Sequence, residues 1–211
     1  GFFMRFDVIH YDQIGSTSVE AARLVKANNI TAPMLVSAAS QHNGKGSRGR
    51  SWQSLQGNVY ATYVFPVDLK SGSTHLTVYP ISVATQQTVQ EFLPDRRVQI
   101  KWPNDILVEG RKVSGALHEI VSQGSISYFL AGIGINVTSH PTSDVLFPAC
   151  DFTVFTDQAV SAQTVIQCLT ARLEQALKNW EENSFQSVRD EYLKSAYGLG
   201  ERMTISANGD R

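Results

Sequence analysis

The sequence predicts an α+β fold in which helices flank a meander of antiparallel strands. Residues 106–108 and 113–121 form apolar or alternating runs around a tight turn at 109–111, and a second turn at 122–124 leads into a run at 126–135. Apolar residues at helical spacing precede and follow this meander. With 211 residues, of which 42% are apolar, the chain fits one globular domain with a small appendage and excludes a disordered protein.

The first half of the chain alternates between helix and strand signals. Thr17 has the position of a helix cap, because Thr17 and Glu20 have the spacing of a capping box and apolar residues follow at helical positions. We therefore expect the first helix over residues 17–28. The other elements expected here are a buried strand at 34–38, a glycine-rich loop at 41–52, a strand at 58–65, a helix at 76–93 and a strand that begins at 98–102.

The last third of the chain is predicted to be mainly helical. Val165, Leu169 and Leu173 recur at helical spacing and predict a long amphipathic helix. A shorter helix is expected at about 185–196. A run of strand-forming character at 203–206 then has no partner left in the chain, which is typical of the start of a further domain.

Composition and spacing exclude several kinds of function. The net charge of -1 argues against a protein whose main activity is to wrap nucleic acid. Cys150 and Cys168 form no CxxC motif and the five histidines lack metal-ligand spacing, so we expect no disulfide framework and no metal held by the protein alone. Polar residues interrupt the uncharged stretch 120–143 too often for a membrane span, and the N-terminus lacks a signal peptide. We expect a cytoplasmic protein.

The glycine-rich loop fits a dinucleotide-binding pattern only superficially. Residues 44–49 match GxGxxG, but that site needs a helix at the third glycine, and only residues 50–56 separate the loop from the next glycine and strand. The loop instead suits an anion, because its glycines let backbone N–H groups approach while Lys45, Arg48 and Arg50 supply positive charge. A solvated basic surface loop and a nucleic-acid contact remain open alternatives.

Three further motifs lie at predicted strand ends or within strands. Residues 101–105, LysTrpProAsnAsp, place a cation, an aromatic ring and a carboxamide-carboxylate pair together, although a packing corner with turn residues would also fit. In the strand 112–119, Gly115 would let a ligand approach the face opposite Lys112. GlyIleGlyIleAsn at 132–136 is a second strand relieved by glycine, and close backbone packing is its alternative explanation.

These blocks, in this order and spacing, resemble the signature motifs of biotin protein ligases. The similarity extends from about Ile14 into the 190s, and SerThrSer at 16–18 matches the family's early biotin-contacting block. The resemblance implies a mixed, mostly antiparallel sheet flanked by helices, of the biotinyl/lipoyl ligase type related to class II aminoacyl-tRNA synthetases. It assigns residues 1–197 to a catalytic domain and 198–211 to the start of a truncated SH3-like C-terminal β-domain.

The resemblance also implies a two-step reaction. The biotin carboxylate attacks the α-phosphate of Mg-ATP to give biotinyl-5′-AMP, and a lysine of a biotin carboxyl carrier domain of a carboxylase then takes the biotinyl group. A carboxylate nucleophile is already ionised, so the first step needs no general base. Cations and oriented N–H donors are then the main catalytic device. The expected catalytic residues are Lys45, Arg48, Asn104 and Lys112.

By the same resemblance, the site divides into two groups of side chains. The biotin-binding residues would be Ser16, Thr17, Gln41, Gly44, Lys45, Trp52, Lys112, Gly115, Leu117 and Gly132. The nucleotide-binding residues would be Arg48, Arg50, Trp52, Asn104, Lys112 and Asn136, with an adenine-side segment at 147–149.

Two departures from the family pattern affect the expected partners. The first biotin block begins at Ser16, which leaves no room for an N-terminal DNA-binding domain, so we expect no DNA partner and no repressor role. Ser47 stands where many members have an arginine that helps to hold the adenylate phosphate. Biotin, ATP and the carrier domain are the expected partners, without a membrane, and a homodimer is left open. The alternatives are a lipoate ligase, whose arginine-pair and triple-glycine loop is missing, and a non-catalytic cofactor-binding module.

Overall fold

The computed structural model describes residues 4–30, 33–50, 54–142, 147–182 and 185–199. Trp52 and the strand expected at 203–206 lie outside the described residues, as does nearly all of the expected C-terminal β-domain.

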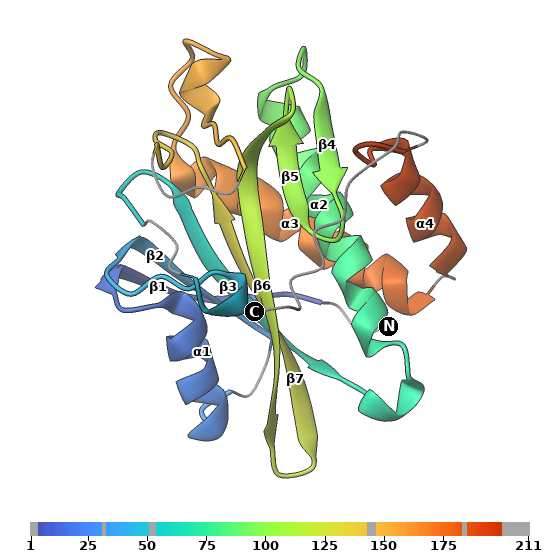
Figure 1. The fold of residues 1–211 in the computed structure, drawn as a ribbon. Coiled ribbons are helices and arrows are strands. Elements are labelled where there is room, and N and C mark those ends of the chain that lie inside the picture. The colour runs from blue at the N-terminus through green and yellow to red at the C-terminus, as the bar shows by residue number, and fades with distance from the viewer. Residues whose placement is uncertain (1–3, 31–32, 51–53, 143–146, 183–184, 200–211) are drawn as a thin grey trace, which may run out of the picture.

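A seven-stranded sheet forms the centre of the fold, with the strand order β1-β2-β3-β7-β6-β5-β4. β1 (Asp7–Ile14) pairs in parallel with β2 (Met34–Gln41), and all other neighbours are antiparallel. The predicted mixed, mostly antiparallel sheet is therefore confirmed (Figure 1). The remaining strands are β3 (Val59–Val67), β4 (Val98–Lys101), β5 (Asp105–Val108), β6 (Arg111–Gln123) and β7 (Ile126–Ile135).

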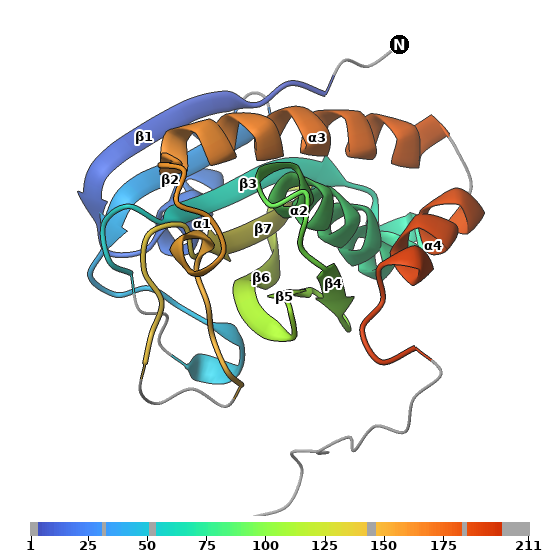
Figure 2. The ribbon, with the colours of Figure 1, turned by 90° about the horizontal axis from the view of Figure 1, so that it is seen from above.

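Helices cover the two faces of this sheet unequally. Successive side chains of β7 point to opposite faces of the sheet. Leu130 packs into a small apolar cluster with α1, whereas Phe129 and Ala131 belong to the large cluster beneath α2 and α3. Figure 2 shows α2 and α3 side by side on their face of the sheet. The helices are α1 (Thr17–Lys26), α2 (Val78–Phe92), α3 (Ala162–Glu182) and α4 (Phe185–Lys194).

The start of α1 differs from the prediction. Ser16, not Thr17, is the N-cap, because the Ser16 side chain accepts a hydrogen bond from the Val19 amide at 3.3 Å. The Glu20 carboxylate does not complete a capping box, since it binds Arg23 and Tyr11 instead. Thr17 is thus the first helical residue.

β1 was not expected from the sequence. Its burial alternates only weakly and most of its side chains are exposed, because it lies at the edge of the sheet and pairs with β2 alone. The parallel pairing follows from the connection through α1, which returns the chain to the same end of the sheet.

Candidate active site

The first helical turn of α1 is tied to the end of β2. The Thr17 amide donates to Gln41 Oε1 at 2.8 Å, and Gln41 Nε2 donates to Ser54 Oγ at 3.0 Å. Ser16 lies one residue before this contact and is buried as the helix cap. The structure therefore brings together Ser16, Thr17 and Gln41, three residues expected to contact biotin.

A cluster of hydroxyl groups lies beneath this turn. Thr62 Oγ1, from β3, is 2.9 Å from Thr17 Oγ1 and 3.0 Å from Ser18 Oγ, and all three residues are buried. The motifs did not identify Thr62. Its signal in the sequence is a threonine that interrupts the apolar run of a buried strand.

The strand glycines lie in two rows that cross the sheet on the α1 face. In one row Thr62 pairs with Gly132 and Gly132 with Leu117. A Cβ atom on Gly132 would lie 2.6 Å from Ser18 Oγ and 3.1 Å from the Leu117 carbonyl oxygen, so glycine is required here by close packing.

The second row places two glycines side by side. Tyr60 pairs with Gly134, and Gly134 with Gly115, two residues further along each strand on the same face. Neighbouring strands thus lack side chains at adjacent positions, so a bound group can approach both backbones. Gly115, Leu117 and Gly132, predicted as one lining, share this face.

The basic loop follows directly after β2. The Gly46 amide donates to the Arg50 carbonyl at 2.7 Å, which folds the loop back on itself. Arg48 is exposed and has a left-handed backbone, φ 58° and ψ 35°, which non-glycine residues rarely adopt. The loop is therefore closed by a backbone hydrogen bond, with Arg48 exposed within it. Gly44, by contrast, is buried at its start.

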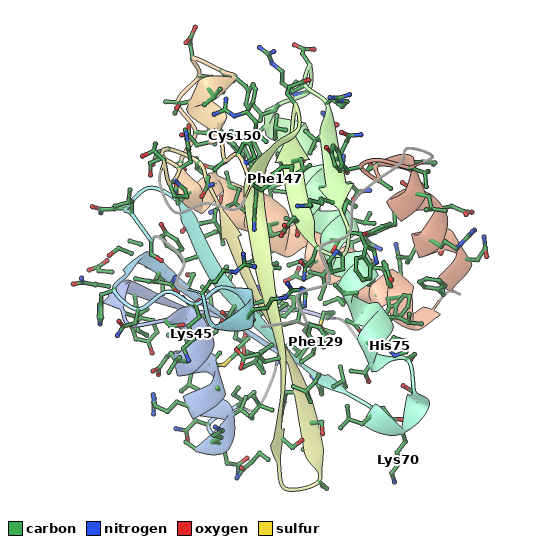
Figure 3. All side chains as sticks on the ribbon, viewed as in Figure 1. Lys45, Lys70, His75, Phe129, Phe147 and Cys150 are labelled. Atoms are coloured by element: carbon green, nitrogen blue, oxygen red, sulfur yellow. The ribbon has the colours of Figure 1, made fainter. Side chains whose placement is uncertain are left out.

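Lys45 reaches the α1 side of the sheet. It lines a cavity of about 610 Å³ together with Ser18 and Arg23 of the first helix and Glu119 of β6. Figure 3 places Lys45 close to α1. Ser18 belongs both to this cavity and to the hydroxyl cluster, so Lys45 lies at the biotin side of the expected site.

The lysine of the third motif forms an ion pair with the second motif. Lys112 Nζ, at the start of β6, lies 3.3 Å from Asp105 Oδ1, and both side chains are about one-quarter exposed. The motif 101–105 forms the β4–β5 hairpin connection, in which Lys101 pairs with Asp105 and Asn104 lies within the turn. Asn104 thus immediately precedes the aspartate that pairs with Lys112.

The segment around Phe147 packs against these same strands. Lys101 Nζ lies 3.9 Å from the centre of the Phe147 ring, and Figure 3 shows Phe147 and Cys150 near the start of β6. The Lys112 amide donates to the Pro148 carbonyl at 2.7 Å, so the expected adenine-side segment adjoins Lys112.

Asn136 is buried and its side chain is engaged by the protein. Its Nδ2 donates to the Cys150 carbonyl at 3.1 Å, and its amide donates to the Val113 carbonyl at 2.8 Å. Burial raises the pKa of the Cys150 thiol to about 12, so this thiol is not a nucleophile at neutral pH. Asn136 and Cys150 therefore build the wall of the site.

Two further features of the described ranges concern metal ions and membranes. Within them, no three or more His, Cys, Asp or Glu side chains are arranged to hold a metal ion. None of the helices that the structure describes is both long enough and apolar enough to cross a membrane.

A mixed sheet that presents buried hydroxyls and paired glycines on one face, beside a basic loop, defines the class of this chain as an α+β protein. A model of the biotin/lipoate A/B protein ligase family matches residues 12–136, and the chain belongs to this family. The predicted resemblance is confirmed.

Curated relatives and solved structures agree with this assignment. A biotin--[acetyl-CoA-carboxylase] ligase of Paracoccus denitrificans is 29% identical over 88% of this chain and 79% of the relative. The bifunctional ligase/repressor BirA of Bacillus subtilis is 28% identical over 93% of this chain, which spans only 61% of that relative's length. The biotin protein ligase of Aquifex aeolicus in complex with biotin and ATP has a TM-score of 0.78 and 25% identity, covering 92% of this chain and 80% of that one.

Proposed function

We propose that this chain is an ATP-dependent biotin protein ligase. The observation that carries the proposal is that motifs distant in the sequence meet in the fold: Gln41 binds the turn of Thr17, Gly115 adjoins Gly134, and Lys112 binds Asp105. The Aquifex relative, which binds biotin and ATP in its crystal structure, supports the same ligands here.

The first step joins biotin to the nucleotide. A biotin carboxylate oxygen attacks the α-phosphorus of ATP, the bond to the β-phosphate oxygen breaks, and pyrophosphate leaves with its electron pair. Both reactants are anions, so the barrier falls where cations meet the charge that develops on the α-phosphate. Lys112 supplies such a charge from a strand, and Lys45 and Arg48 supply others from the loop.

The second step transfers the biotinyl group to a protein. The neutral ε-amine of a lysine attacks the acyl carbon of biotinyl-5′-AMP, an amide bond forms, and AMP leaves while the amine gives up a proton. The acceptor is a biotin carboxyl carrier domain, consistent with the carboxylase named for the Paracoccus relative.

The two groups of side chains divide the work between substrates. The hydroxyl and carboxamide groups of Ser16, Thr17 and Gln41 suit the ureido ring, which needs several neutral hydrogen bonds when it is buried. Asn104, Lys112 and Arg50 serve the phosphates, and Asn136 supports the nucleotide from within the wall.

Magnesium would accompany the nucleotide. Asn104 and Asp105 offer the oxygen atoms that Mg²⁺ prefers, but the Asp105 carboxylate is already paired with Lys112. The residues therefore fit an ion held mainly by the ATP phosphates, whose chemistry is to neutralise phosphate charge. We also propose that residues 1–197 belong to the catalytic domain and that residues 198–211 begin a C-terminal β-domain.

Pyrophosphate exchange into ATP tests the proposal directly. The protein is incubated with ATP, Mg²⁺ and labelled pyrophosphate, and biotin, lipoate and octanoate are supplied in parallel. Exchange that depends on biotin is the expected result. Comparable exchange with lipoate would instead favour a lipoate ligase, which belongs to the same family, and no exchange with any acid would favour a binding module.

A further inference from the structure

A buried carboxylate lies outside the groups that the proposed reaction uses. Asp151 is 4% exposed and accepts hydrogen bonds from the Thr153 amide at 2.8 Å and from His140 Nδ1 at 2.6 Å. Burial alone would raise the pKa of Asp151, but the hydrogen bonds from Thr153 and His140 outweigh it and hold the pKa below its usual value. Asp151 is therefore ionised at neutral pH.

The residue before Asp151 connects two parts of the proposed nucleotide site. The Cys150 amide donates to the Lys112 carbonyl at 2.8 Å, and the Cys150 carbonyl accepts from Asn136 Nδ2 at 3.1 Å. The Lys112 amide in turn donates to the Pro148 carbonyl at 2.7 Å. The backbone of Cys150 thus binds both the Lys112 carbonyl and the Asn136 side chain. A shift of Cys150 would therefore displace Lys112 and Asn136 together.

Both ends of the contact between Asp151 and His140 are fixed. On the His140 side, Asn58 Oδ1 accepts from the Val137 amide at 2.9 Å and Asn58 Nδ2 donates to the Ser139 carbonyl at 3.0 Å. On the other side, Phe152 is buried and its ring stacks on Phe92 of α2 with 6.0 Å between centroids. The pair thus joins the end of β7 to the wall behind Lys112.

We propose that Asp151 and His140 are positioning residues for the adenylation step. They hold Cys150 so that Lys112 and Asn136 meet the nucleotide, and they touch neither substrate. The proposal rests on the proposed function, because it takes Lys112 and Asn136 as parts of the nucleotide site. It predicts a defect that appears in the use of ATP and spares biotin binding.

Asp151→Asn is the direct test, since asparagine keeps an oxygen for the Thr153 amide but removes the charge that faces His140. We expect kcat/KM for ATP in biotin-dependent exchange to fall about tenfold, because small displacements of positioned groups have large effects on rate. The dissociation constant of biotin should change less than twofold. Asp157→Asn, at an exposed aspartate shortly after the same turn, is the matched control and should change neither quantity.

A second pair of variants separates positioning from stability. His140→Phe removes the donor to Asp151, whereas His140→Gln retains an amide that can donate to it, so glutamine should restore most of the activity that phenylalanine loses. Equal losses in ATP use and biotin affinity, or a wild-type kcat/KM for ATP in Asp151→Asn, would overturn the proposal. ATP affinity is titrated separately. A wild-type protein without biotin-dependent exchange would refute the proposed function. Wild-type exchange together with an unchanged kcat/KM for ATP in Asp151→Asn would refute the positioning role alone.

Discussion

Lys112 is the side chain to which the proposed reaction gives the most specific role. Its charge lies at the start of a strand and is oriented by Asp105 at 3.3 Å, so little reorganisation is needed as charge develops on the phosphate. An interaction of this kind acts on the transition state more than on the bound substrate.

We therefore expect Lys112→Ala to lower the rate of adenylation by about 10² to 10³, with ATP affinity changed only slightly. Single-turnover formation of biotinyl-5′-AMP measures the rate, and equilibrium titration measures the affinity. Lys70→Ala, at an exposed lysine in the turn that follows β3, is the control. A variant whose only defect is weaker ATP binding would contradict the assigned role.

Ser47 is the position at which this sequence departs from the pattern that the resemblance implies, and Arg48 is the residue next to it. A serine at 47 offers at most one neutral hydrogen bond where an arginine would give two charge-assisted bonds. We therefore propose that Arg48 takes over part of the work of holding the intermediate. Arg48 is exposed, and its left-handed backbone fixes it in the loop.

We expect Arg48→Ala to release biotinyl-5′-AMP and to biotinylate lysines of a bystander protein such as serum albumin. Adding Ser47→Arg to this variant should restore retention. The measurement is the dissociation rate of the preformed adenylate, and an unchanged rate in Arg48→Ala would show that Arg48 is only solvated.

At the scale of elements, the contact between α1 and the central strands determines the shape of the biotin side. Gly132 is the tightest point, because an added Cβ atom would meet Ser18 Oγ at 2.6 Å and the Leu117 carbonyl at 3.1 Å. A side chain there must push α1 away from β7.

We expect Gly132→Ala to destabilise the protein by about 1–3 kcal/mol and to weaken biotin binding. Ser18→Ala removes the nearer obstacle, so the Gly132→Ala penalty should be smaller in a Ser18→Ala background. Urea unfolding of the four proteins measures this coupling. Gly15→Ala is a matched control, since its Cβ would meet nothing nearer than 3.7 Å, and additive effects of the other two changes would argue against the contact.

Most helices and strands could be predicted from local sequence patterns, but the pairing of strands within the sheet could not. The hairpins at 106–135 and the helices around 17 and 165 carry clear periodicity, and all appear in the structure. β1 was missed in the sequence analysis because this exposed edge strand has no buried face, and its sequence therefore lacks a clear alternation of apolar and polar residues. The pairing of β3 with β7 leaves no local trace either, since it joins segments far apart in the chain.

The candidate site divides in the same way. The resemblance to biotin protein ligases named Lys112 and Gln41, and the structure shows their partners. Thr62 and Asp151 were missed because a threonine in a strand and an aspartate before a turn are common for local reasons. Only the tertiary contacts show what each one holds.

At the scale of the whole molecule, His118 links the pH to the stability of the central sheet. Its ring packs against Phe129, and neither ring nitrogen is exposed or has a hydrogen-bond partner among the described residues. Burial lowers the pKa of His118 to about 4. Below about pH 6.5, His118 therefore becomes protonated in the unfolded chain but stays neutral in the folded chain. The free energy of unfolding consequently falls as the pH falls towards 4.

We expect this histidine to contribute a loss of about 2 kcal/mol in the free energy of unfolding between pH 6.5 and pH 5. His118→Leu should remove that part of the loss and be at least as stable at pH 7, because two unpartnered nitrogens are replaced by apolar atoms. His75→Leu, at an exposed histidine, should leave the pH dependence unchanged. Urea titrations at several pH values measure it, and parallel curves for wild type and His118→Leu would refute the assignment.

The central position of the β3–β7 pair also fixes when the site can come into existence. Thr62 meets Gly132 only when residues 59–67 pair with 126–135. The hydroxyl cluster that contains Thr62 therefore cannot pack against Gly132 until the second of these strands is available. A chain emerging from the ribosome would expose the earlier strands, with their apolar faces, while more than half of its length was still being made. Such long-range pairing is slow to form, and biotin could act as a ligand only for chains that have completed it.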